Sequence, residues 1–195
     1  FDIKMARVFK KVTTGEDLAK LFKISNIYFD LDKSEITERA KKDLFKIAMA
    51  IPNVYVGSVS MGANMMQTLK TFKEAYEHNG PSIIIAYSPC IAQGIHGGLS
   101  NQLEEQKILV DVGYNILMRY NPEEDKLVVD SKEPDFTNYS AVFERELRYR
   151  NLEIINEDEY QELYESNMNA SKSRYYYYKN LENKEGWFLL LFWYN

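Results

Sequence analysis

The chain has 195 residues, a length that suits one domain with a substantial core and a small appendage. Its 29 acidic residues outnumber its 24 lysines and arginines, and the formal net charge of -5 argues against nucleic acid as the main partner, because backbone phosphates attract a basic surface. A single cysteine excludes an internal disulfide and a metal site built only from the chain's own thiolates, and it is compatible with a reducing, cytoplasmic setting.

The amino-terminal part begins with residues too polar for a secretory signal, and the start at Phe1 suggests a processed or trimmed chain. A short helix is predicted over residues 16–22, and residues 26–31 alternate as a strand with one exposed face does. Asp30 and Asp32 point the same way on that strand. Without a third oxygen ligand, we interpret them as a solvated face rather than a cation site.

A strand, helix and strand unit follows a helix that Thr37 caps and Pro52 ends. Residues 54–59 are rich in β-branched side chains and predict the first strand. The next helix carries apolar residues at helical spacing, and residues 83–85 are three isoleucines, a run typical of a strand covered on both faces. A right-handed crossover would make the two strands parallel and bring their loops to the same edge.

The remaining elements complete an α/β fold, which we predict to be a three-layer sandwich with a mainly parallel sheet. Four adjacent tyrosines in the last helix would cover all of its sides, and we expect them to pack over the sheet rather than bind a ligand. The predicted elements are a helix over residues 100–112, a strand over 116–120, a short edge strand over 126–130 and a helical region from Tyr139 onward.

The single cysteine, Cys90, follows the isoleucine strand directly after Pro89. Ligands of open α/β sheets gather at the carboxyl ends of the strands, so its thiol is a candidate contact, although a free cysteine is also a common small buried hydrophobe. His96 lies in the same loop, where a mobile loop histidine is favoured over a metal or nucleophile pair. Gly62 and Asn64 occupy a strand-to-helix turn that could present backbone N–H groups to an anion. A single glycine is weak evidence for such an anion site.

The segment around Cys90 resembles the last third of the pyruvate:ferredoxin (flavodoxin) oxidoreductases. The likeness covers about residues 41–182, in one order and at compatible spacing. The residues that carry it are Met61-Gly62-Ala63-Asn64, Tyr87-Ser88-Pro89-Cys90-Ile91-Ala92-Gln93-Gly94-Ile95, Lys41-Lys42-Asp43-Leu44, Val54-Tyr55-Val56, Gln67-Thr68-Leu69-Lys70, Gly113-Tyr114, Arg119-Tyr120-Asn121-Pro122, Asp130-Ser131-Lys132-Glu133-Pro134-Asp135, Glu146 and Arg148-Tyr149.

This resemblance implies part of a thiamine-diphosphate-binding fold, in which Cys90 matches a position that supplies one thiolate to a 4Fe-4S cluster. The Gly-Asp-Gly diphosphate motif and the three further cluster cysteines of the family do not occur in the chain. We therefore expect the chain alone to hold neither cofactor and to be inactive without the remaining oxidoreductase domains or subunits. Ferredoxin or flavodoxin is the implied electron-transfer partner.

The amino-terminal segment, about residues 26–44, resembles the start of an outer-membrane-protein-A-like peptidoglycan-binding domain. We divide the chain into a segment of different origin, 1–40, a partial thiamine-diphosphate-binding-like domain, 41–182, and an apolar tail, 183–195. The alternatives to an oxidoreductase fragment are a non-catalytic α/β scaffold or fusion product, and a cell-wall-associated protein.

The tail is far shorter than the roughly 20 apolar residues of a membrane-spanning helix. We expect residues 187–194 to pack as a strand or tail rather than to contact a membrane. Left exposed, so apolar a segment would favour self-association, and its deletion should then lower aggregation or break an oligomer.

Overall fold

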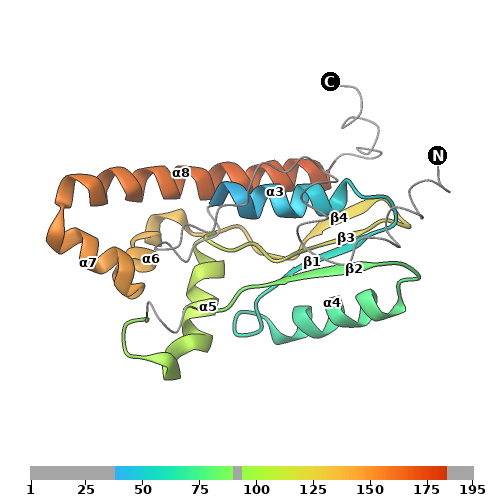
Figure 1. Cartoon of the computed structure of the whole chain (residues 1–195), viewed down its shortest axis with the longest axis horizontal. Coiled ribbons are helices and arrows are strands. Elements are labelled where there is room, and N and C mark those ends of the chain that lie inside the picture. The colour runs from blue at the N-terminus through green and yellow to red at the C-terminus, as the bar shows by residue number, and fades with distance from the viewer. Residues whose placement is uncertain (1–37, 90–93, 184–195) are drawn as a thin grey trace, which may run out of the picture. The chain divides into compact units, whose positions relative to one another are not determined.

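The computed structural model describes residues 38–89 and 94–183 (Figure 1). The chain divides into two units, Phe1–Lys41 and Lys42–Asn195, and the described residues belong almost entirely to the second. Several predicted features lie outside the described residues: the helix over 16–22, the strand over 26–31 with Asp30 and Asp32, Cys90 itself and the tail over 187–194.

Helices and strands alternate over residues 38–121, and after one further strand the described residues are helical, as the sequence pattern predicts. No helix among these residues combines the length and the apolar character needed to cross a membrane. The elements in chain order are α3 (Glu38–Met49), β1 (Tyr55–Val59), α4 (Met65–Glu77), β2 (Ser82–Ala86), η1 (Leu99–Asn101), α5 (Gln102–Asp111), β3 (Met118–Asn121), β4 (Lys126–Val129), η2 (Phe136–Asn138), α6 (Ser140–Arg145), α7 (Leu147–Ile155) and α8 (Glu157–Glu182).

The four strands form one sheet in the order β2-β1-β3-β4. β1 and β2 are parallel, with Val56 opposite Ile83, as the predicted strand, helix and strand unit requires. β3 runs antiparallel to β1 and β4 runs antiparallel to β3. The predicted α/β class is confirmed, but the sheet is mixed where the sequence predicted a mainly parallel one.

The position of α5 explains the antiparallel direction of β3. Gln106 of α5 accepts hydrogen bonds from the Ser60 hydroxyl at 3.0 Å and from the Gly62 amide at 2.9 Å, just beyond the carboxyl end of β1. This contact keeps α5 at the edge where β2 leaves the sheet, so the chain enters β3 from that same edge. A helix that ran back along the sheet would instead have produced a parallel strand.

Helices cover both faces of the sheet, which confirms the three-layer sandwich. Figure 1 shows α3 and α8 on one face and α4 on the other. The rings of Phe45 in α3 and Tyr178 in α8 meet edge to face at 5.5 Å between centroids. Tyr175 and Tyr178 are buried while Tyr176 is 45% exposed, so the tyrosine run spans the buried and the exposed side of α8.

The isoleucine strand β2 differs from its prediction. It was expected to be covered on both faces, but it is the edge strand of the sheet, and its three isoleucines are only half-buried. The central strand β1, by contrast, is buried along its whole length. The predicted edge strand over residues 126–130 is confirmed as β4, at the opposite edge.

A second cluster of buried aromatic residues joins α5 to α8 beyond one end of the sheet. The Phe143 ring stacks on Tyr149 at 4.3 Å and meets the edges of Tyr160 and Tyr164 at 5.4 and 5.3 Å. Leu109 of α5 and Val142 of α6 belong to the same buried cluster. This cluster packs α5, α6, α7 and α8 together at one end of the sheet. Both ends of the segment over residues 87–95, called the Cys90 loop below, are attached to these helices.

Candidate functional site

The carboxyl ends of β1 and β2 lie at one edge of the sheet because the two strands are parallel. Pairing continues one residue beyond β2, where the Tyr87 amide donates to the Val59 carbonyl at 3.0 Å. The turn after β1 and the start of the Cys90 loop therefore leave the sheet side by side. This edge is where open α/β sheets place their ligands.

Gly62 lies in the turn after β1, where it packs against the backbone of α5. A Cβ at this position would be 2.7 Å from the Leu103 Cα and 2.8 Å from its carbonyl oxygen. Only glycine fits here, because the two backbones approach too closely for a side chain. Its amide donates to Gln106. The N–H that the sequence suggested for an anion therefore has a partner within the chain.

Asn64 is the N-cap of α4. Its side-chain oxygen accepts a hydrogen bond from the Gln67 amide at 2.9 Å, which satisfies one of the free donors at the start of the helix. Capping accounts for an asparagine here without a ligand. The suggested role of Gly62 and Asn64 in binding a cofactor stays a prediction.

Glu146 connects the two ends of the Cys90 loop. Its carboxylate accepts from the Tyr87 hydroxyl at 3.2 Å on the side before Cys90, and its backbone forms an antiparallel bridge with Ile95 on the side after it. The neighbouring His96 amide donates to the Arg145 carbonyl at 2.7 Å. Glu146 is fully buried, so both ends of the loop are attached to the junction of α6 and α7.

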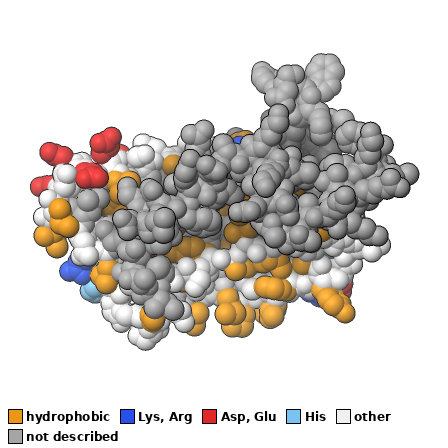
Figure 2. All heavy atoms as spheres, in the orientation of Figure 1, with side chains coloured by type: hydrophobic (Ala, Val, Ile, Leu, Met, Phe, Trp, Pro, Cys, Tyr) orange, Lys and Arg blue, Asp and Glu red, His pale blue; other side chains and the backbone are white. Residues whose placement is uncertain are grey.

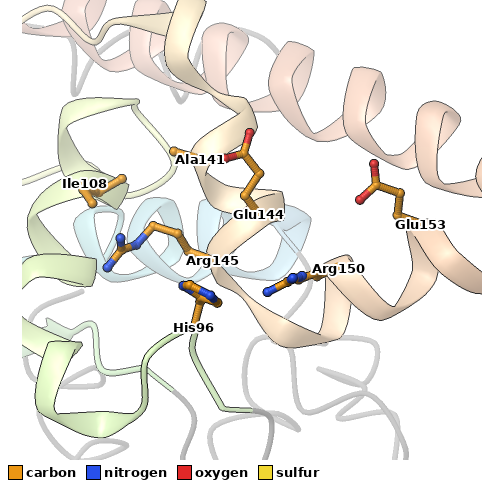
Figure 3. A pocket seen from close by; sticks show the side chains of 7 residues that line it. All are labelled: His96, Ile108, Ala141, Glu144, Arg145, Arg150 and Glu153. Carbon is orange, nitrogen blue, oxygen red and sulfur yellow. The ribbon is translucent and has the colours of Figure 1, made fainter.

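A cavity of about 510 Å³ opens beside this junction (Figure 3). Charged side chains of both signs surround it, together with one imidazole, so it does not select a ligand of one charge. It is lined by His96, Ile108, Ala141, Glu144, Arg145, Arg150 and Glu153.

A partly buried ion pair between α5 and α6 lies next to the cavity. The Arg145 Nε donates to Oε2 of Glu105, which is fully buried, and the Arg145 Nη2 lies 3.9 Å from Glu104. Burial raises the pKa of the Glu105 carboxyl above its ordinary value, and the hydrogen bond from Arg145 opposes this rise. The pair holds α5 to the helix junction that carries the Cys90 loop.

The two histidines have separate places. His96 is exposed and lines the cavity. His78 is the C-cap of α4, and its ring nitrogens contact the Asn53 carbonyl at 3.1 Å and Glu123 at 3.2 Å. His78 therefore serves the carboxyl terminus of α4.

Within residues 38–89 and 94–183, no three histidine, cysteine or acidic side chains gather in a way that could hold a metal ion. A single thiolate at Cys90 therefore fits an iron–sulfur cluster only if other ligands come from elsewhere. The resemblance included Glu146 without giving it a role, and sequence reasoning missed the roles of Arg145 and Glu105, because buried and exposed charged side chains look alike within a polar helical pattern.

The chain is similar to several curated oxidoreductases. It is 40% identical over 151 residues to the pyruvate-flavodoxin oxidoreductase of Trichormus variabilis, a match that covers 75% of this chain. It is 34% identical over 150 residues to the protein of the same name from Klebsiella pneumoniae, covering 74%, and 37% identical over 146 residues to the pyruvate:ferredoxin oxidoreductase of Moorella thermoacetica, covering 72%.

The matched region is a small part of each relative. The chain spans 12% of the length of the Trichormus protein, 13% of the Klebsiella protein and 12% of the Moorella protein. No protein-family model matches the chain. The predicted likeness to the oxidoreductases is confirmed over about three quarters of the sequence, and the chain corresponds to a fragment of such an enzyme.

Proposed function

We propose that this chain supplies one segment of a pyruvate:ferredoxin (flavodoxin) oxidoreductase, with Cys90 as one thiolate ligand of a 4Fe-4S cluster. The observation that supports this most is the attachment of both ends of the Cys90 loop, through Tyr87 and Ile95, to the buried Glu146. A ligand that holds an iron ion in a fixed position needs such support on both sides.

The cluster would supply one-electron transfer when it is bound. Cys90 would hold one iron, and Glu146 would keep the loop in place from the helix junction. The three other thiolates must come from the remaining oxidoreductase polypeptide, because the chain has one cysteine. A reducing compartment such as the cytoplasm is part of this proposal, since Cys90 must remain a thiolate.

Thiamine diphosphate would bind in the completed domain rather than to this chain alone. The Gly62 amide already donates to Gln106, so it is not available to a diphosphate without rearrangement, and the Asn64 side-chain oxygen is used as an acceptor from the Gln67 amide. The completed enzyme would oxidatively decarboxylate pyruvate and pass the electrons to ferredoxin or flavodoxin. The isolated chain would do neither.

Complementation tests this proposal. The chain is combined anaerobically with the Trichormus oxidoreductase from which the matched segment has been deleted, and iron, sulfide and thiamine diphosphate are supplied. We expect pyruvate-dependent flavodoxin reduction and a four-iron paramagnetic signal in the mixture, and neither from the chain alone. A Cys90→Ala variant should lose the signal of the cluster that Cys90 helps to hold.

The control is Ser88→Ala, which changes an exposed side chain two residues before Cys90 and should retain both readouts. A stable four-iron signal from the isolated chain, or full activity with Cys90→Ala, would contradict the proposal. The amino-terminal likeness to peptidoglycan-binding domains remains a separate prediction, and retention of the chain on insoluble peptidoglycan would support it.

A further inference from the structure

Helix α4 packs on the sheet through polar side chains. Its buried residues are Gln67, Thr68 and Thr71. The Gln67 amide group donates to the Ser58 carbonyl at 3.3 Å and to Asp130 at 3.0 Å. A surface helix ordinarily buries an apolar stripe, so this inward face is the reverse of the usual pattern.

The apolar stripe of α4 faces outward instead. Its exposed fractions run from 53% for Phe72 to 90% for Tyr76. Figure 2 shows hydrophobic side chains gathered along this side of the molecule, over α4. The large exposed apolar side chains of the helix are Met65, Met66, Leu69, Phe72 and Tyr76.

The adjoining edge of the sheet is also open within the described residues. The Pro81 carbonyl and the Tyr87 amide both bond to β1, so alternation directs the backbone groups of Ser82, Ile84 and Ala86 away from it. No described strand pairs with this side of β2. An unpaired edge with half-buried isoleucines is a ready template for another strand.

The opposite edge of the sheet is protected. The outward Val129 amide of β4 donates to the Glu182 carboxylate of α8 at 2.9 Å, and Lys179 pairs with the same carboxylate at 2.6 Å. The fold thus closes one edge with its own helix and leaves the other edge beside an apolar helix face. We therefore expect a further polypeptide segment to pack beside β2 and not beside β4.

We infer that the outer face of α4 and the edge of β2 form the surface on which the remaining oxidoreductase polypeptide packs. This inference rests on the proposed function, since that polypeptide is the occupant. The chain spans only 12% of the Trichormus relative, so most of the polypeptide that folds with this segment lies outside it. The occupant should offer apolar side chains to α4 and a strand to β2.

The charges on α4 also favour an apolar occupant over a charged one. The lysines beside the stripe are already paired along the helix, Lys70 with Glu74 at 3.9 Å and Lys73 with Glu77 at 3.7 Å. What remains is an apolar centre with a balanced polar margin, the usual anatomy of a protein interface.

Binding of the deleted Trichormus oxidoreductase to the full chain tests the inference. The double variant Leu69→Glu with Phe72→Glu should weaken binding about a hundredfold, because two apolar side chains would no longer be buried. The matched control is Ile154→Glu with Ile155→Glu, which alters two exposed apolar residues of α7, 80% and 79% exposed, and should bind as the original chain does. Circular dichroism checks that both variants keep the fold.

Hydrogen exchange of the Ile84 and Ala86 amides gives a second readout and should slow in the complex. Equal binding by the chain and its α4 variant would overturn the inference while leaving the proposed function intact. No binding by the original chain would overturn both. Slow exchange of these amides in the isolated chain, or a dimer that the α4 variant dissociates, would show that the chain itself covers this surface and would also overturn the inference.

Discussion

Arg119 joins three parts of the fold through its guanidinium. Its Nε and Nη2 each donate to Asp130, after β4, at 2.7 Å, and its Nη1 donates to Glu74 of α4 at 2.6 Å. The Tyr55 hydroxyl donates to the same Glu74 at 2.8 Å. The hydrogen bonds to Asp130 raise the pKa of Arg119 above its ordinary value, so it stays charged in its nearly buried position.

Replacing Arg119 should therefore be costly. In Arg119→Met, the side chain keeps its length, but the partly buried carboxylates of Glu74 and Asp130 lose their partner. We expect the free energy of unfolding to fall by about 3 kcal/mol, measured by urea denaturation. Lys107→Met, which removes an exposed positive charge, is the control and should change stability by less than about 0.5 kcal/mol. A similar loss in both variants would contradict this account.

Gly62 provides a second test at a single residue. In Gly62→Ala the new methyl group would meet the Leu103 backbone at 2.7 Å, which cannot yield as a flexible side chain can. We expect a loss of about 2 kcal/mol from the displacement of α5. Gly98→Ala is the comparison, because no atom lies within 4 Å of its Cβ position and only its φ of +82° opposes the change. Its loss should be about 1 kcal/mol, and a greater loss there than at Gly62 would contradict the packing argument.

Among the elements, most helices and strands could be predicted, because their spacing and stop signals are local. Prolines and β-branched runs located β1 and β2 closely. The direction of β3 could not be predicted, because it depends on the tertiary contact of Gln106 with Gly62. Nor does a run of isoleucines show whether another strand lies beside it, since the same pattern suits an internal strand and an edge that another polypeptide covers.

The buried tyrosines of these helices and strands should make the stability of the fold depend on pH in the alkaline range. Burial raises the pKa of Tyr55, Tyr120, Tyr160 and Tyr175 above the ordinary 10.0. As the pH rises, the tyrosines of the unfolded chain lose their protons before those of the folded chain. The contribution of these tyrosines to stability is therefore full below pH 10.0 and is lost as the pH rises through their higher pKa values in the folded chain. Chemical denaturation at several alkaline pH values should show this decline. Stability that increased across the same range would contradict it.

For the molecule as a whole, the sequence predicted the candidate site only in part. The end of the isoleucine strand and the resemblance both predicted a role for Cys90, which stays a prediction, and the right-handed crossover predicted the edge of the sheet where its loop begins. The supporting groups lie more than ten residues from Cys90, and no local pattern shows that they are buried. They are Glu146, which the resemblance included without a role and which lies between α6 and α7, and the Arg145–Glu105 pair. Likewise, helical spacing revealed the apolar stripe of α4, but spacing cannot tell whether a stripe faces the chain's own sheet or another polypeptide.

The central claim is that the Cys90 sulfur is bonded to iron in the completed oxidoreductase. Because the chain has one cysteine, labelling it with carbon-13 at the β-carbon marks Cys90 alone when the rest of the complex is unlabelled. Electron–nuclear double resonance on the reduced complex should show a carbon-13 hyperfine coupling to the cluster. A four-iron signal without that coupling, in a complex that contains the labelled chain, would show that Cys90 is not a ligand.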